Sequence, residues 1–233
     1  LFPYRNGFID PFTDRTSDFY SYQNFANAIN RISAFELLIE RRCGRNLQRI
    51  THINKATGVE TLLSTSQDFD ASWVAHLPII KESVRYGDFL AEGDLTKRKR
   101  ELAAFLANIS HETTGGPEEG NTYEWGLFFK IEGGGNSTPG PYVIPHDDYP
   151  AVEGQSYYGR GPIQLSYNFN YGQASEHIFG DKNKLLENPG LLETNAEISF
   201  MTAIWFWMTP QAPKPSAHDV ILDLYEPSQE EID

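Results

Sequence analysis

Apolar residues recur at helical spacing in two separate parts of the chain. Between residues 18 and 33 they fall three or four positions apart, at Tyr22, Phe25, Ile29 and Ile32, which predicts an amphipathic helix. Residues 198–208 are apolar on every side, so this segment predicts a buried central helix, ended by the prolines that follow.

The segment between these helices begins with a different pattern. β-Branched residues lie on both sides of the turn-rich stretch 54–58, and this predicts a β-hairpin over residues 48–66, at the edge of the domain. A further helix is predicted after Asp68 or Asp70, although Pro78 must kink or end it. Its apolar positions are Trp73, Val74, Leu77 and Ile80.

A third helical stripe leads to a candidate catalytic carboxylate. The stripe consists of Leu102, Phe105, Leu106 and Ile109 and follows the basic run 97–100, which we expect in a solvated turn. The same spacing puts Glu112 at the edge of the stripe, just before a pair of glycines ends the helix. A carboxyl that is partly withdrawn from water holds its proton more tightly, which suits a proton donor. The structural alternative is a helix-terminal ion pair.

Residues 115–157 are rich in Gly, Pro, Asn and Asp and show no sustained periodicity. Irregular segments of this length in a compact domain are usually functional or mobile. We therefore predict that this segment forms the wall of a cleft.

Length and charge narrow the class of protein. The 233 residues suit a single domain, 1–233, with room for two lobes. A net charge of −13 argues against nucleic acid and anionic membranes as partners, and no apolar run approaches the roughly 18 residues of a membrane span. Cys43 is the single cysteine, so we expect no intrachain disulfide and a small buried side chain. The first residues do not resemble a signal peptide, and we expect a mature or trimmed product.

Three segments carry a specific resemblance. Residues 110–116 read Ser-His-Glu-Thr-Thr-Gly-Gly, and residues 157–166 read Tyr-Tyr-Gly-Arg-Gly-Pro-Ile-Gln-Leu-Ser. Residues 204–209 read Ile-Trp-Phe-Trp-Met-Thr, and Pro-Lys-Pro-Ser follows at 213–216. The zinc-protease motif is excluded, because its second histidine is replaced by Gly115. In this order the segments resemble the family 19 chitinases, over residues 1–221 apart from an insertion at about 39–96.

The resemblance implies a mainly α fold: a lysozyme-like, bilobal helical domain with a small β-hairpin and a long irregular cleft loop. It also implies glycoside hydrolysis with inversion and without metal or cofactor. By resemblance Glu112 is the general acid and Glu132, after the aromatic run that follows Trp125, is the general base. Nearby rivals for the base are Glu118, Glu119 and Glu124. Ser166 is implied to help hold the attacking water, and the residues implied to line the sugar subsites are His111, Gln164, Asn170 and Lys214.

Some positions depart from the family pattern. The family's C-terminal Asn-Ile-Ile-Asn-Gly-Gly segment is absent from these residues, and Phe169 stands where many members have Tyr. Plant members carry several disulfides, so a single cysteine favours the bacterial-type branch.

The sequence therefore predicts a secreted, extracellular and monomeric endo-acting chitinase that cleaves β-1,4-linked N-acetylglucosamine polymers or chitooligosaccharides. One alternative is a peptidoglycan-lytic hydrolase of the same fold. Another is a catalytically silent chitin-binding protein, against which the retention of both Glu112 and Glu132 argues.

Overall fold

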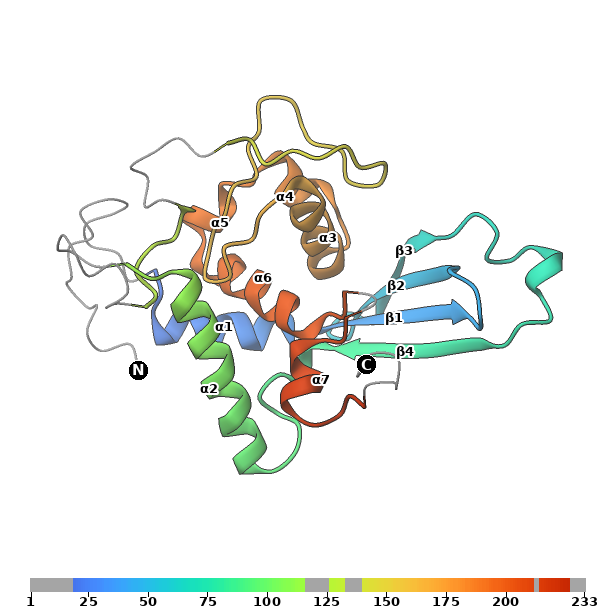
Figure 1. The fold of residues 1–233 in the computed structure, drawn as a ribbon, viewed down its shortest axis with the longest axis horizontal. Helices are drawn as coiled ribbons and strands as arrows, with labels where there is room; N and C mark the ends of the chain where they lie inside the picture. The colour runs from blue at the N-terminus through green and yellow to red at the C-terminus, as the bar shows by residue number, and fades with distance from the viewer. Residues whose placement is uncertain (1–18, 116–125, 133–139, 212–213, 227–233) are drawn as a thin grey trace, which may run out of the picture.

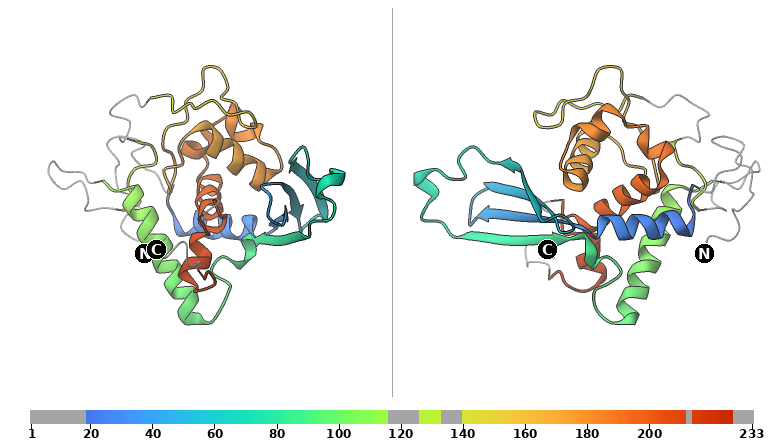
Figure 2. Two further views of the ribbon diagram at one scale, coloured as in Figure 1. Left: turned by 45° about the vertical axis from the view of Figure 1, so that its right-hand side comes forward. Right: turned by 180° about the vertical axis from the view of Figure 1, so that it is seen from behind.

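The computed structural model describes residues 19–115, 126–132, 140–211 and 214–226. In this part of the chain, helices form a body from which an antiparallel sheet projects to one side (Figure 1), and the other views agree (Figure 2). The elements, in chain order, are α1 (Tyr22–Ile32), β1 (Phe35–Arg42), β2 (Gln48–Asn54), β3 (Val59–Thr65), the 3₁₀ turn η1 (Ser72–Val74), β4 (Ile79–Arg85), the 3₁₀ turn η2 (Tyr86–Asp88), α2 (Leu95–Glu112), α3 (Asn168–Phe179), α4 (Asn183–Glu187), α5 (Leu191–Thr194), α6 (Ala196–Met208) and α7 (Ala217–Ile221).

Helix α6 is the centre of the body. The Asn195 side chain caps its N-terminus by accepting a hydrogen bond from the Ile198 amide at 3.0 Å. From Ile198 onward every residue of α6 except Phe206 is buried, and the helix contacts α1, α3, α5 and α7. The predicted buried central helix is therefore confirmed. None of the helices in the described ranges is both long and apolar enough to cross a membrane.

Helix α1 is also confirmed. Ser21 caps it by accepting a hydrogen bond from the Asn24 amide, and its buried face consists of Phe25, Ala28 and Ile32. The Phe25 ring stacks on Phe105 of α2, with the ring centroids 5.8 Å apart. The first predicted stripe thus packs against the third.

The β structure is larger than the sequence predicted. Strands β2 and β3 form the expected hairpin, but they are half of a four-stranded sheet in the order β3-β2-β1-β4. Strand β1 pairs antiparallel with β4 from Glu36–Arg85 to Arg42–Ile79. The part of residues 115–157 that the structure describes contains no helix or strand longer than a single bridge or turn, in line with the predicted irregular loop.

The helix predicted after Asp68 was wrong. The chain forms only η1 there and then enters β4. The carbonyl of Pro78 accepts a hydrogen bond from the amide of Cys43 at 2.9 Å, and the next residue pairs with the end of β1. Pairing with a distant strand outweighed a weak local helical pattern. Cys43 was expected to be buried but is exposed, because the turn after β1 lies at the end of the projecting sheet.

The basic run 97–100 was expected in a turn and instead lies in the first turns of α2. The Asp94 carboxylate caps this helix by accepting a hydrogen bond from the Lys97 amide at 2.9 Å, so the helix begins before the run. The Lys97 ammonium donates to the Leu222 carbonyl at 2.8 Å, and Arg100 pairs with Asp223 at 2.7 Å. The basic side chains therefore connect α2 to the segment after α7.

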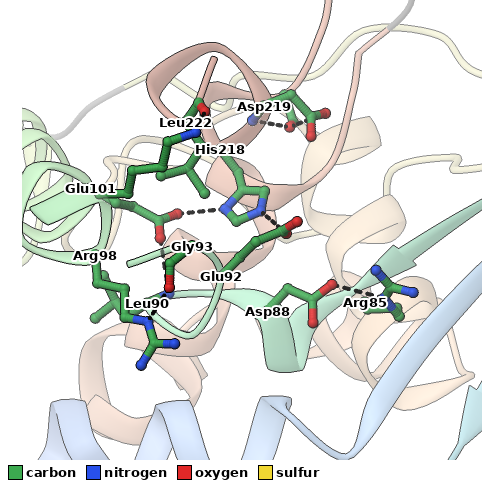
Figure 3. A network of polar contacts seen from close by, with 12 residues as sticks. Arg85, Asp88, Leu90, Glu92, Gly93, Arg98, Glu101, His218, Asp219 and Leu222 are labelled. Atoms are coloured by element: carbon green, nitrogen blue, oxygen red, sulfur yellow. Dashed lines mark hydrogen bonds and ion pairs between the residues drawn. The ribbon is translucent and has the colours of Figure 1, made fainter. Parts of the chain in front are cut away.

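A buried polar network joins α2, α6 and α7. Figure 3 shows its contacts around Glu101 and His218. Glu101 of α2 is fully buried, and its Oε2 accepts a hydrogen bond from the Leu90 amide at 2.9 Å. Its Oε1 lies 3.1 Å from Trp207 Nε1 and 2.6 Å from His218 Nδ1. The other ring nitrogen of His218 lies 3.3 Å from a carboxylate oxygen of Glu92. The helix that carries Glu112 is thus fixed to the core through its middle.

Candidate active site

Helix α2 ends at the candidate acid. Glu112 is its last residue, as the predicted stripe required, but the residue is exposed rather than partly withdrawn from water. The reason is the helical period. The buried positions Phe105 and Ile109 continue to Thr113, four residues after Ile109, so Thr113 turns into the core and Glu112 faces outward. His111, the residue before Glu112, is also exposed.

Thr113 connects the end of α2 to the segment that leads to Glu132. Its hydroxyl donates to the Ile109 carbonyl at 2.6 Å and accepts from the Leu127 amide at 2.8 Å. Its carbonyl accepts from the amides of Phe128 and Phe129, each at 3.0 Å. Because Thr113 follows Glu112 directly, these bonds bring the two glutamate-bearing segments into contact.

Two glycines permit this close approach. A Cβ on Gly115 would lie 2.3 Å from the Phe128 ring, and a Cβ on Gly126 would lie 2.5 Å from the Cβ of Ser110. Both distances are shorter than van der Waals contact. Gly115 of the motif, predicted only to end a helix, therefore also makes room for the aromatic run.

Glu132 is held by a short pairing with the segment 159–161. The Glu132 amide donates to the Gly159 carbonyl at 2.9 Å, and the Gly161 amide donates to the Lys130 carbonyl at 2.9 Å. The Gly159 amide also reaches the side chain, with its nitrogen 3.2 Å from Glu132 Oε2. Tyr142 donates its hydroxyl to the other oxygen, Oε1, at 2.5 Å. Both carboxylate oxygens of the candidate base thus accept a hydrogen bond.

Gln164 and Ser166 converge on the same glycine. A Cβ built on Gly159 would lie 2.9 Å from Gln164 Oε1 and 3.3 Å from Ser166 Oγ. Ser166 donates its hydroxyl to the Gln164 carbonyl at 2.9 Å, and the side-chain Nδ2 of Asn170 donates to the Ser166 carbonyl at 2.9 Å. Three residues singled out from the sequence, Glu132, Gln164 and Ser166, therefore surround Gly159, and Asn170 supports them.

Other sequence predictions are not joined to this group. Lys214 is exposed, and among the described residues no hydrogen bond or ion pair connects it to Glu112 or Glu132. The rival bases Glu118, Glu119 and Glu124 lie outside the described residues. The described part of the chain contains no cluster of three His, Cys, Asp or Glu side chains suited to a metal ion.

Arg160, to which the sequence assigned no role, supports the backbone beside Glu132 from within the core. This side chain is 4% exposed, and its guanidinium lies 3.5 Å from the centroid of the Tyr158 ring. It is also paired with Glu193 of α5 and donates to the Tyr171 hydroxyl of α3 at 3.1 Å. A buried arginine next to the Gly159 amide therefore fixes the backbone that contacts Glu132. The sequence signal that could have identified Arg160 is its place inside the 157–166 motif.

Asn168 is a second residue that the sequence left without a role. Its side chain is fully buried, accepts from the Ile144 amide at 2.8 Å, and donates to the carbonyls of Ile144 and Tyr149 at 2.9 and 2.7 Å. These bonds attach the irregular segment 140–157 to the start of α3. They hold Tyr142 close to Glu132.

A family model described as "Chitinase class I" of glycoside hydrolase family 19 matches residues 72–233. The chain belongs to glycoside hydrolase family 19. All of the segments that carry the resemblance from residue 110 onward lie inside the matched range, whereas strands β1, β2 and β3 of the projecting sheet precede it. The family 19 membership predicted from the sequence is therefore confirmed.

Three curated relatives of this family 19 chain are plant proteins. The "Basic endochitinase" of Vitis vinifera is 54% identical over 142 residues, which cover 60% of this chain and 43% of that protein. "Chitinase 9" of Oryza sativa subsp. japonica is 48% identical over 156 residues, 66% of this chain and 45% of that protein. "Endochitinase 4" of Solanum tuberosum is 51% identical over 145 residues, 61% of this chain and 46% of that protein.

The chain thus spans less than half the length of these relatives. Among solved structures, the family 19 class IV chitinase from Zea mays matches with a TM-score of 0.41 and 35% identity, over 53% of each chain. The bacterial-type branch that the missing disulfides suggested finds no support, since the three curated relatives come from plants.

Proposed function

We propose that this protein is an endo-acting chitinase that hydrolyses β-1,4-linked N-acetylglucosamine polymers in one inverting displacement. The observation that carries the proposal is the convergence of Glu132, Gln164 and Ser166 around Gly159 in a chain of family 19. The names of the relatives from Vitis vinifera and Solanum tuberosum, which are endochitinases, give the substrate class.

In the proposed mechanism, Glu112 is protonated and gives its proton to the glycosidic oxygen as the bond from that oxygen to the anomeric carbon breaks. Water attacks the anomeric carbon from the opposite face, while Glu132 takes one of its protons and Ser166 orients it. Inverting enzymes place the two carboxyl groups roughly 6.5–9.5 Å apart so that this water fits between them. The exposure of Glu112 leaves it accessible to a sugar chain, and the two hydrogen bonds to Glu132 hold its carboxylate in place.

The remaining assignments belong to the same proposal. We assign His111, Gln164, Asn170 and Lys214 to the sugar subsites, and residues 1–233 to one catalytic domain of lysozyme-like, bilobal form. We also propose that the protein is secreted and monomeric and that it has neither nucleic acid nor membrane as a partner, in keeping with its net charge of −13.

Two substrates offered in parallel test the proposal. The protein should release soluble sugar from colloidal chitin and leave the turbidity of bacterial cell walls unchanged. Clearing of cell walls without release of sugar from chitin would instead support a peptidoglycan-lytic hydrolase. Binding to chitin without hydrolysis would mean a catalytically silent protein.

The stereochemistry of the first product tests the role of Glu132. If Glu132 activates water, a β-linked chitin oligomer must yield the α-anomer first, and no glycosyl-enzyme forms. Proton NMR of the nascent products distinguishes the two anomers. A β-anomer that appears first would mean retention, and the assignment of Glu132 as general base would have to be abandoned.

A further inference from the structure

Backbone strain gathers around Glu132. Six non-glycine residues in the described part of the chain have positive φ, and three of them, Tyr142 (51°), Gln164 (50°) and Tyr167 (71°), lie at this carboxylate or against the residues that touch it. Left-handed conformations are strained at bulky residues and persist where the surrounding structure imposes them. One of the three residues, Tyr142, contacts the carboxylate directly.

We propose that Tyr142 is a positioning residue for the general base, and that its hydroxyl fixes the rotation of the Glu132 carboxylate toward the attacking water. This inference rests on the proposed function. The Tyr142 hydroxyl donates to Oε1 at 2.5 Å, while the Gly159 amide donates to Oε2 at 3.2 Å. With one donor on each oxygen the carboxylate plane is fixed, and each oxygen retains a lone pair for a water molecule.

Gly159 connects this plane to Ser166. The Gly159 amide donates to Oε2 of Glu132. The hydroxyl oxygen of Ser166 lies beside the Cα of Gly159. A water that contacts both Glu132 and Ser166 would therefore lie on the Gly159 side of the carboxylate. A rotated carboxylate would lose that alignment, and small misplacements of reacting groups have large effects on rate.

The ring of Tyr142 is itself held in place. The carbonyl of the preceding residue, Pro141, accepts a hydrogen bond from the Tyr157 amide at 2.8 Å. The Tyr142 ring meets the Tyr167 ring edge to face, with centroids 5.2 Å apart and planes at 64°. Two residues later, Ile144 is bound through both its amide and its carbonyl by Asn168. The hydroxyl is thus presented to Glu132 by a fixed segment.

The electrostatics agree with a donor role. The pKa of Tyr142 is raised above its usual range, first by the hydrogen bond to the Glu132 carboxylate and second by burial. The phenol consequently keeps its proton throughout the pH range in which Glu132 must act as a base. A hydrogen bond to a charged acceptor is among the stronger kinds found in proteins.

The variant Tyr142→Phe removes the hydroxyl and keeps the ring contact with Tyr167. With soluble chitin oligosaccharides we expect kcat to fall about 10- to 100-fold, the range for a lost hydrogen bond to a charged group. KM should change by less than about threefold, because the hydroxyl orients the base and does not bind the sugar. The matched control is Tyr86→Phe, which removes a buried tyrosine hydroxyl bonded to Thr209 at 3.1 Å, far along the chain from the site, and should leave kcat unchanged.

A second measurement separates positioning from a structural role. In a Glu132→Gln background, whose residual rate does not depend on a general base, adding Tyr142→Phe should lower kcat by less than about twofold. The proposal is overturned if Tyr142→Phe retains the wild-type kcat, if it raises KM alone, or if its effect is the same in both backgrounds. If the wild type does not hydrolyse chitin, or if Glu132→Gln is as active as wild type, the proposed function itself is wrong.

Discussion

Replacing Glu101 by glutamine is a sharp test of the buried network in Figure 3. The amide has the shape of the carboxylate, so no cavity forms. If its oxygen takes the place of Oε1, it still accepts from Trp207 and His218, but its NH₂ then faces the Leu90 amide, and two donors meet without an acceptor. Rotating the amide by half a turn only moves the conflict to the other two donors. The substitution also removes the negative charge opposite His218.

The magnitude follows from these losses. A buried donor without an acceptor costs about 1–3 kcal/mol, and a hydrogen bond to a charged group contributes about 1.5–3 kcal/mol. Glu101 is fully buried and the His218 side chain is 6% exposed, so solvent screens the pair very little. We expect Glu101→Gln to lower the free energy of unfolding by about 3–5 kcal/mol, a large part of the 5–15 kcal/mol typical of a domain.

Denaturant unfolding at pH 6, followed by tryptophan fluorescence, measures this loss. The matched control is Glu153→Gln, the same chemical change at an exposed position in the irregular segment, which should stay within about 0.5 kcal/mol of wild type. If Glu101→Gln also stays within that margin, the network does not contribute as its geometry indicates, and the argument from buried donors is refuted.

The same network predicts a dependence on pH. Burial by itself lowers the pKa of His218, but hydrogen bonds to the Glu101 and Glu92 carboxylates and the nearby charge of Asp219 outweigh it, so the folded-state pKa is raised above 6.5. A raised histidine pKa stabilises the fold fully below the unfolded value of 6.5, and this contribution is lost as pH rises through the folded value. The difference in unfolding free energy between wild type and His218→Gln should therefore shrink as pH rises above 6.5. A difference that does not change with pH would show that His218 is not charged in the fold.

Three further results are expected. Glu112→Gln should abolish hydrolysis and leave oligosaccharide binding nearly intact in calorimetry, since acid–base groups contribute about 10²–10⁴-fold; a rate above about a tenth of wild type would remove Glu112 from the acid role. Thr113→Val should lower the midpoint of denaturant unfolding by an amount equal to about 1–3 kcal/mol, because the buried Leu127 amide loses its acceptor, and an unchanged midpoint would contradict the contact. Burial and, to a smaller extent, the nearby His52 lower the pKa of His177 to about 3. The unfolded chain therefore binds a proton that the fold does not, and the free energy of unfolding should fall by up to about 1.4 kcal/mol per pH unit as pH drops below 6.5. The variant His177→Gln should lessen that loss.

The local sequence pattern was sufficient to predict an element where one buried face or one turn determines that element. The helices α1 and α6 and the end of α2 at Glu112 follow from apolar spacing, because burying a stripe of side chains dominates the energy of a helix. The hairpin of β2 and β3 follows from its turn. The motif segments were sufficient to name the family, and they contain Glu112, Gln164 and Ser166.

Long-range contacts decided the rest. Strand β4 exists because β1 offers it a partner some forty residues back in the chain, and no local period encodes that partner. Glu101 and His218 are 117 positions apart, so nothing in the spacing around either residue predicts their contact. The sequence by itself determined which glutamates are candidates and where α2 ends. Only the tertiary structure decided that Thr113 joins their segments and that Tyr142 reaches Glu132, because hydrogen bonds between separate segments of the chain, which no local pattern encodes, make those contacts.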